Sequence, residues 1–212
     1  MALQNRVCPD GELVAVMARG SLMGNRGGRL HDPVSRTLAT RRWASKQWIS
    51  CTLTFKGRHR TVWGQSYTEL FFLDEATALA AGHRPCYECR RRDAHAFADA
   101  IADRDGLERR PTAGELDQRL HAERLDGRAK RLHVCSFAAL PGGAIVLHDG
   151  QPRAVLGDQL VRWTHGGYTD GIVRPHKGNA RVLTPPTALA ALVAGYEPAE
   201  GGLLAPRQDR PE

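Results

Sequence analysis

The residues best suited to chemistry are two cysteines separated by two positions, Cys86 and Cys89. Two thiolates at this spacing can bind one Zn²⁺ at about 2.3 Å each, and the start of a helix would favour their negative charge. A redox dithiol and a chance pair share the spacing, but here a helix and a glycine precede the motif instead of a strand. The pattern therefore indicates half of a zinc site, which needs two further ligands.

The remaining ligands must come from distant parts of the chain. Cys51 is the first candidate, because the elements expected after it could return the chain beside the helix start. His31 is the preferred fourth ligand. The alternatives are His59, His83 and Cys8. Five cysteines, an odd number, argue against a disulfide scaffold, and Cys135 on an apolar strand is expected to be a small buried side chain.

A second chemical pair is His121 and Glu123. Zinc deaminases contain a His-x-Glu sequence followed by a Pro-Cys-x-x-Cys sequence. In this chain the Pro-Cys-x-x-Cys sequence comes first. The two side chains would also lie about 200° apart on an ideal helix. A general acid-base role in a cleft is therefore one interpretation, and solvated positions on a helix are the other.

Positive charge is concentrated near the N-terminus. Residues 1–60 contain eleven Lys and Arg against three Asp and Glu, in a chain of net charge +7. Such asymmetry is typical of a surface that binds a polyanion, although a solvated basic face gives the same pattern. Trp43 and Trp48 lie among these cations, which favours nucleic acid. The candidate contacts are Arg26, Arg29, Arg41, Arg42, Lys46, Arg58 and Arg60.

The elements that must position these groups predict an α+β fold. We expect a small zinc-stabilised domain with a β-hairpin, a further strand and two helices, followed by a helix and an antiparallel β-meander. The first part comprises a loop-rich basic arm over 1–45, a hairpin of 47–55 with 60–64, and a strand at 68–73. A helix over 74–81 is capped by Asp74 and ended by Gly82, and the next helix starts near 85–87.

The second part begins after a polar linker at 103–112. It contains a helix over 113–125, strands at 133–137, 144–148, 152–156 and 159–163, and a last helix at 186–194. The expected domains are 1–104 and 113–196, with a frayed tail over 197–212. The longest apolar stretches fall short of the roughly 20 residues of a membrane span, and the N-terminus has no secretory pattern, so we expect a cytoplasmic protein that meets no membrane.

A longer motif surrounds the two cysteines. Residues 69–89 run from Glu69-Leu70-Phe71-Phe72 through Glu75-Ala76 and Ala81-Gly82 to Arg84-Pro85-Cys86-Tyr87-Glu88-Cys89. This run resembles the end of the Ada-type metal-binding domain of adaptive-response DNA repair proteins. The resemblance implies that Cys86 and Cys89 are two of four zinc ligands on a small α+β domain that touches DNA. That family has an upstream Cys-x₃-Cys pair, whereas Cys51 has no such mate, so methyl transfer is not implied.

Together these patterns predict a zinc-binding protein that binds nucleic acid, DNA more readily than RNA, in repair or processing. One alternative is a zinc-dependent enzyme acting on a nucleic acid or nucleotide, as a hydrolase, a nuclease or a deaminase-like enzyme. Another is a zinc-stabilised module that binds a protein partner. The sequence leaves open whether the protein is an enzyme.

Overall fold

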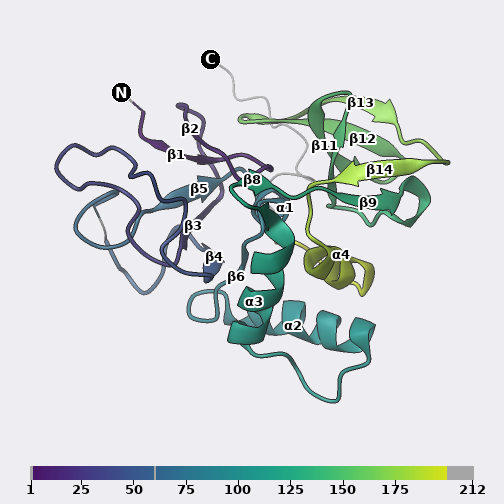
Figure 1. The fold of residues 1–212 in the computed structure, drawn as a ribbon, viewed down its shortest axis with the longest axis horizontal. Coiled ribbons are helices and arrows are strands. Elements are labelled where there is room, and N and C mark those ends of the chain that lie inside the picture. Colours follow the sequence, from purple (N-terminus) through teal and green to yellow (C-terminus); the bar gives the residue numbers. More distant parts are fainter. Residues whose placement is uncertain (1, 60, 200–212) are drawn as a thin grey trace.

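The computed structural model describes residues 2–59 and 61–199 and contains two six-stranded sheets with helices between and below them (Figure 1). The N-terminal sheet has the strand order β2-β1-β5-β3-β4-β6 and mixes parallel with antiparallel pairs. Its strands are β1 (Gln4–Val7), β2 (Leu13–Ala15), β3 (Leu22–Arg26), β4 (Trp48–Cys51), β5 (Leu70–Phe72) and β6 (Arg84–Pro85).

The C-terminal sheet is antiparallel throughout, with the order β13-β12-β11-β10-β14-β9. Short turns join β10, β11 and β12, as the glycine-containing sequence between them predicts. Its strands are β9 (His133–Ser136), β10 (Ile145–His148), β11 (Gln151–Leu156), β12 (Gln159–Thr164), β13 (Gly167–Val173) and β14 (Asn179–Val182). A two-stranded ribbon, β7 (Leu125–Asp126) with β8 (Ala129–Lys130), precedes this sheet, and a short 3₁₀ turn, η1 (Phe137–Ala139), follows β9.

Helix α1 (Glu75–Ala80) lies at the centre of the molecule, and all six of its residues are buried (Figure 1). Asp74 caps it by accepting a hydrogen bond from the Thr77 amide at 2.8 Å. Gly82 follows the helix at φ +84°, a left-handed conformation that favours glycine. The sequence predicted this helix, its cap and its end correctly. From the other sheet, Trp163 donates a hydrogen bond to the Thr77 hydroxyl at 2.9 Å, so α1 joins the two sheets.

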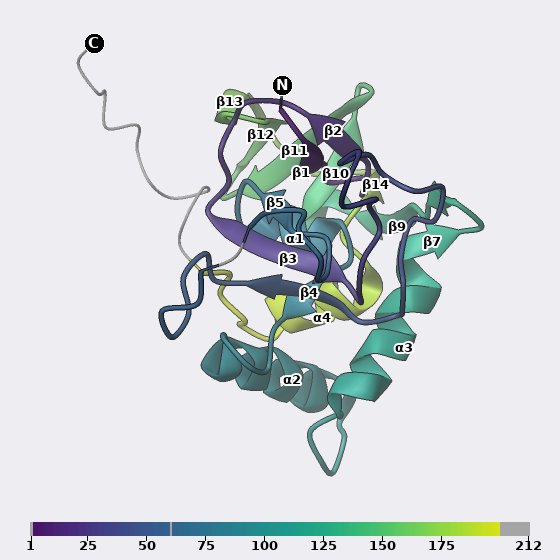
Figure 2. The ribbon, with the colours of Figure 1, turned by 90° about the vertical axis from the view of Figure 1, so that its left-hand side faces the viewer.

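The other helices are α2 (Arg91–Asp105), α3 (Ala113–Arg124) and α4 (Pro186–Val193), and they lie below the sheets in Figure 2. A capping box of Thr112 and Glu115 starts α3 at Ala113, where the sequence placed the beginning of this helix. The main hydrophobic cluster contains Leu79 of α1, Phe97 of α2 and Val146 of β10. This cluster therefore has members on both sides of the polar segment at 103–112.

The mixed α+β class is observed, but the N-terminal part differs from expectation in three places. The predicted hairpin of 47–55 with 60–64 does not form, because β4 pairs with β3 and β6, and residues 61–64 contain no strand. The expected basic arm over 1–45 contains β1, β2 and β3. Helix α2 begins at Arg91, because residues 86–89 form a turn before it.

Two expectations concern parts that the structure does not describe in full. Arg60 and residues 200–212, which make up most of the expected frayed tail, lie outside the described residues. Within the described part of the chain, no helix combines the length and the apolar character that crossing a membrane demands.

Candidate metal centre and adjoining pocket

The structure brings Cys51, Cys86 and Cys89 together, with their sulfur atoms within 4.8 Å of one another. They lie close enough to bind one metal ion. Cys51 ends β4, and Cys86 directly follows β6, the strand that runs parallel to β4 with Ser50 opposite Pro85. The register of this strand pair therefore places the two cysteines side by side. Among the described residues no fourth His, Cys, Asp or Glu joins the group.

Backbone hydrogen bonds shape the turn that carries Cys86 and Cys89. The Cys86 amide donates to the Ser50 carbonyl at 3.0 Å, and the Arg90 amide donates to the Cys86 carbonyl at 2.9 Å. The amide of Glu88 points at the Cys86 sulfur, at 3.4 Å. Since α2 starts just after Cys89, the positive end of its dipole also lies near the sulfurs. The turn is therefore built to hold negative charge.

Two buried ion pairs fix this turn to the rest of the protein. Arg90 binds the Glu75 carboxylate of α1 at 2.6 Å and the Ser50 hydroxyl at 3.0 Å. Arg84 makes a bidentate pair with Asp117 of α3, with both contacts at 2.8 Å. Each charge is satisfied by a geometrically matched partner, which is the condition under which buried ions are tolerated.

The three thiols have unequal acidities. Hydrogen bonds from Cys51 and Cys89, with the nearby backbone amides, lower the pKa of Cys86 to about 2. The hydrogen bonds that Cys51 makes to Cys86 and Cys89, together with burial, raise the pKa of Cys51. Without metal, one thiolate is thus stabilised by two thiol donors. A cation would displace the protons of the other two, because metal binding requires deprotonated sulfur.

The expectation that His31 supplies the fourth ligand is corrected by its position. Its Nε2 donates to the Gly64 carbonyl at 2.9 Å, and its Nδ1 lies 2.7 Å from the Thr68 hydroxyl. The ring also stacks on Trp63 with centroids 5.1 Å apart. Both ring nitrogens are therefore engaged, and His31 organises a loop instead of joining the cysteines. The alternative His83 is fully buried between Trp48 and Phe72, outside the cysteine group.

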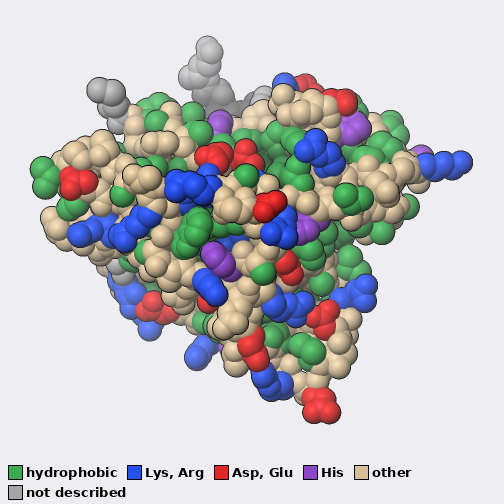
Figure 3. All heavy atoms as spheres, in the orientation of Figure 1, with side chains coloured by type: hydrophobic (Ala, Val, Ile, Leu, Met, Phe, Trp, Pro, Cys, Tyr) green, Lys and Arg blue, Asp and Glu red, His purple; other side chains and the backbone are tan. Residues whose placement is uncertain are grey.

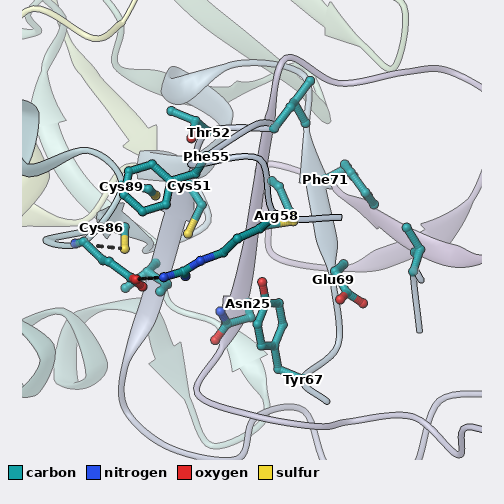
Figure 4. Close-up of a pocket in the computed structure, with 15 residues that line it drawn as sticks. Asn25, Cys51, Thr52, Phe55, Arg58, Tyr67, Glu69, Phe71, Cys86 and Cys89 are labelled. Carbon is teal, nitrogen blue, oxygen red and sulfur yellow. Dashed lines mark hydrogen bonds and ion pairs between the residues drawn. The ribbon is translucent and has the colours of Figure 1, made fainter. Parts of the chain in front are cut away.

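A pocket of about 330 Å³ opens beside the cysteines, and all three line it (Figure 4). Arg58 extends across it and binds the Glu88 carboxylate at 2.6 Å. Its lining is mostly apolar, with Met23, Ile49, Leu53, Phe55, Val62 and Phe71. A metal held by the three sulfurs would therefore present its fourth position close to an apolar chamber. Three protein ligands with one open position are typical of reactive zinc sites, whereas structural sites have four protein ligands.

Glu69 lines the pocket on the side across from the cysteines (Figure 4). It is 1% exposed. Its Oε2 accepts a hydrogen bond from the Trp63 amide at 2.8 Å. Its Oε1 is buried without a hydrogen-bond partner among the described residues. Sequence reasoning missed this group, because nothing in a short strand motif reveals that a glutamate will be buried beside a cavity.

The side chains predicted to contact nucleic acid differ in burial and in their carboxylate partners. Arg26 is buried, with its guanidinium 4.0 Å from the Trp48 ring centre and a hydrogen bond to the Gly11 carbonyl, so its role as a surface contact is corrected. Arg42 pairs with Glu12, and Arg58 pairs with Glu88. Arg29, Arg41 and Lys46 are exposed. Figure 3 shows Lys and Arg spread over this face with acidic side chains among them, rather than joined into one patch.

The two residues of the predicted acid-base pair make packing and capping contacts. The Glu123 carboxylate accepts hydrogen bonds from the Thr187 amide at 2.8 Å and hydroxyl at 2.7 Å. It therefore satisfies the first turn of α4. The ring of His121 packs edge-on against Trp43, and its Nδ1 lies 3.1 Å from Arg124. Neither side chain lines the pocket beside the cysteines, so an acid-base role for this pair remains a prediction that the pocket does not support.

Comparison with known proteins identified no family for the chain. No protein-family model matches the chain, and neither a curated protein nor a solved structure matches it. The resemblance of residues 69–89 to the Ada-type domain rests on those residues alone.

Proposed function

We propose that the chain is a zinc protein, with Cys51, Cys86 and Cys89 as the protein ligands. The observation that carries the proposal is the convergence of three sulfurs at the start of α2. Cysteine sulfur is a preferred ligand of Zn²⁺, and the backbone amides and helix dipole around Cys86 stabilise the thiolate form that zinc requires. Water or a ligand in the pocket fills the fourth position.

We further propose that the protein binds nucleic acid, DNA more readily than RNA. The exposed cations Arg29, Arg41 and Lys46 support this, because none of them has a carboxylate partner among the described residues. The guanidinium groups of Arg29 and Arg41 donate to backbone carbonyls, which orients them without neutralising their charge. Arginines held in this way attract phosphates and release counterions from the strand.

A zinc-dependent enzyme is the second candidate function. The observation in its favour is the three-ligand site next to a mostly apolar pocket, since an open zinc position can activate a bound water. Its substrate would enter the pocket that Arg58 crosses.

Metal analysis of the full chain tests the zinc proposal. We expect one zinc per chain, and loss of zinc in Cys51→Ser, Cys86→Ser and Cys89→Ser. Cys135→Ser is the matched control, because Cys135 lies on β9 of the other sheet. This variant should retain its zinc. Full zinc content in the Cys51 variant would refute the three-sulfur assignment.

A salt titration tests nucleic-acid binding. The logarithm of affinity should fall linearly with the logarithm of salt concentration, and the slope should decrease by about 0.9 for each duplex phosphate contact removed. Arg41→Ser with Lys46→Ser should reduce this slope. Arg181→Ser, an exposed cation on β14, should leave it unchanged. Affinity that does not respond to salt would contradict the proposal.

A further inference from the structure

The pocket beside the cysteines contains a polar group that zinc binding does not use. The free Oε1 of Glu69 is buried, and a buried acceptor without a partner is unfavourable. The other oxygen of the same carboxylate is held by the Trp63 amide, so the side chain is fixed in orientation. An ionised carboxylate oxygen can only accept hydrogen bonds. The group that satisfies it must therefore bring an N–H or O–H donor.

The size and lining of the pocket limit what can bring that donor. Its volume of about 330 Å³ is at the lower end of the range for small-ligand pockets, roughly 300–1,000 Å³. A duplex is too wide for such a space. Phe55, Tyr67 and Phe71 contribute aromatic surface, on which a flat heterocycle can stack. The pocket therefore suits one planar ring that carries a donor on its edge.

Cations lie at the edge of the pocket. Arg58 is exposed, crosses the pocket and pairs with Glu88, and Lys56 is exposed on the same loop. Arg36 is also exposed and donates to the carbonyl of Val62, which lines the pocket, at 3.2 Å. A ring attached to a phosphate-bearing chain would thus meet an apolar interior and a rim where these three cations outnumber the Glu88 carboxylate.

We propose that this pocket binds one unpaired base of a DNA single strand, and that Glu69 Oε1 accepts a hydrogen bond from the exocyclic amino group of that base. The inference rests on the proposed nucleic-acid binding and identifies where the strand is read. Cytosine and adenine present an amino group on the accessible edge, whereas thymine presents carbonyl oxygens on both sides of its single N–H. Those oxygens would repel the carboxylate, so the pocket prefers an amino base to thymine.

Binding of short strands to the zinc-loaded full chain tests this inference. The probes are three fluorescent pentanucleotides with flanking thymines and a central cytosine, thymine or abasic residue, measured by anisotropy. All three carry the same phosphates, so their salt-dependent contributions are equal. We expect the cytosine strand to bind about tenfold more tightly than the abasic strand, as stacking of one base implies. The thymine strand should bind less tightly than the cytosine strand.

The variant Glu69→Gln tests the role of the free oxygen. Its amide oxygen can keep the Trp63 hydrogen bond while its NH₂ group faces the pocket, which turns an acceptor into a donor. We expect the preference to reverse in favour of thymine, with zinc content and salt slope unchanged. Glu108→Gln, an exposed glutamate outside the pocket, is the matched control and should keep the cytosine preference.

The outcomes separate this inference from the function on which it rests. Equal affinity for the cytosine and abasic strands in wild-type protein, with a normal salt slope, would overturn the base pocket and leave nucleic-acid binding intact. This comparison does not depend on any variant folding. A folded Glu69→Gln protein with the wild-type preference would overturn the role of Oε1. Failure of every strand to bind would refute the proposed function and the pocket assignment together.

Discussion

The buried ion pair of Arg90 and Glu75 should be essential for holding the metal centre together. The Glu75 side chain is 0% exposed, and its carboxylate accepts hydrogen bonds from Arg90 and the Tyr196 hydroxyl, at 2.6 and 2.7 Å. Arg90 directly follows Cys89, and it also binds Ser50, which directly precedes Cys51. This arginine therefore joins both segments that supply sulfur, and Glu75 neutralises its charge.

The substitution Glu75→Gln removes that charge while nearly conserving volume. Breaking a buried ion pair typically costs about 3–5 kcal/mol, because the remaining ion is buried without compensation. Asp93 still contacts Arg90 at 2.8 Å and is 37% exposed, so it retains part of the compensation. We therefore expect a loss near the lower limit, about 3 kcal/mol in the free energy of unfolding. For a chain of this length that corresponds to a Tm lower by about 6–12 °C.

Urea unfolding of wild type and variant, both loaded with zinc, measures this loss, and competition with a chelator measures the accompanying loss of zinc affinity. Asp99→Asn is the control, because its pair with Arg110 is exposed and exposed pairs contribute little. A Glu75→Gln variant less than about 1 kcal/mol below wild type, with unchanged zinc affinity, would refute the reasoning.

Three further predictions concern pH, packing and metal removal. Burial holds the pKa of His83 well below its ordinary value of 6.5. The unfolded chain therefore takes up a proton below pH 6.5 that the folded protein does not, and stability falls as pH drops, by up to about 1.4 kcal/mol per unit. His83→Gln should reduce this slope in urea titrations between pH 7 and 5, and an equal slope would contradict the assignment. Gly24→Ala should lower the free energy of unfolding by about 3 kcal/mol or more, because a Cβ added there would lie 2.1 Å from the Ile49 carbonyl oxygen. The control is Gly114→Ala, which should not destabilise the protein because the space around Gly114 is open. Chelation of the metal should lower Tm without loss of far-UV circular dichroism, because the hydrophobic clusters do not depend on the sulfurs, and global unfolding would be the contrary result.

Local signals in the sequence predicted helix α1 and the start of α3 correctly. The cap at Asp74, the glycine at position 82 and the start of α3 at Ala113 each depend on residues within a few positions. In the C-terminal sheet, the consecutive strands β10, β11 and β12 were likewise readable from alternation and short turns, but the pairing of β9 with β14 was not. Such features are determined by neighbouring residues, so a single sequence contains the necessary information.

The arrangement of the N-terminal sheet could not be read in the same way. Cys51 was expected on a hairpin with the residues that follow it, but β4 pairs with β3 before it and with β6 far after it. These pairings depend on burial over long sequence separations, and sequence alternation does not encode the partner of a strand. The expected approach of Cys51 to the helix start therefore comes about through a strand pairing that the sequence did not predict.

Single histidines and arginines were the least predictable residues. The partners of His31 lie 33 and 37 positions away along the chain, at Gly64 and Thr68. Arg26 looks like a surface cation in the sequence, yet it packs on Trp48 in the interior. A long cation can cover an aromatic ring as readily as it can meet a phosphate. Only the three-dimensional structure separates these roles.

X-ray absorption spectroscopy at the zinc edge of the purified protein tests the central claim most directly. The three-cysteine centre predicts three sulfur atoms at about 2.3 Å and one lighter oxygen or nitrogen atom, from water or a ligand in the pocket. A spectrum with two sulfurs or fewer, or a protein that takes up no zinc, would contradict the account.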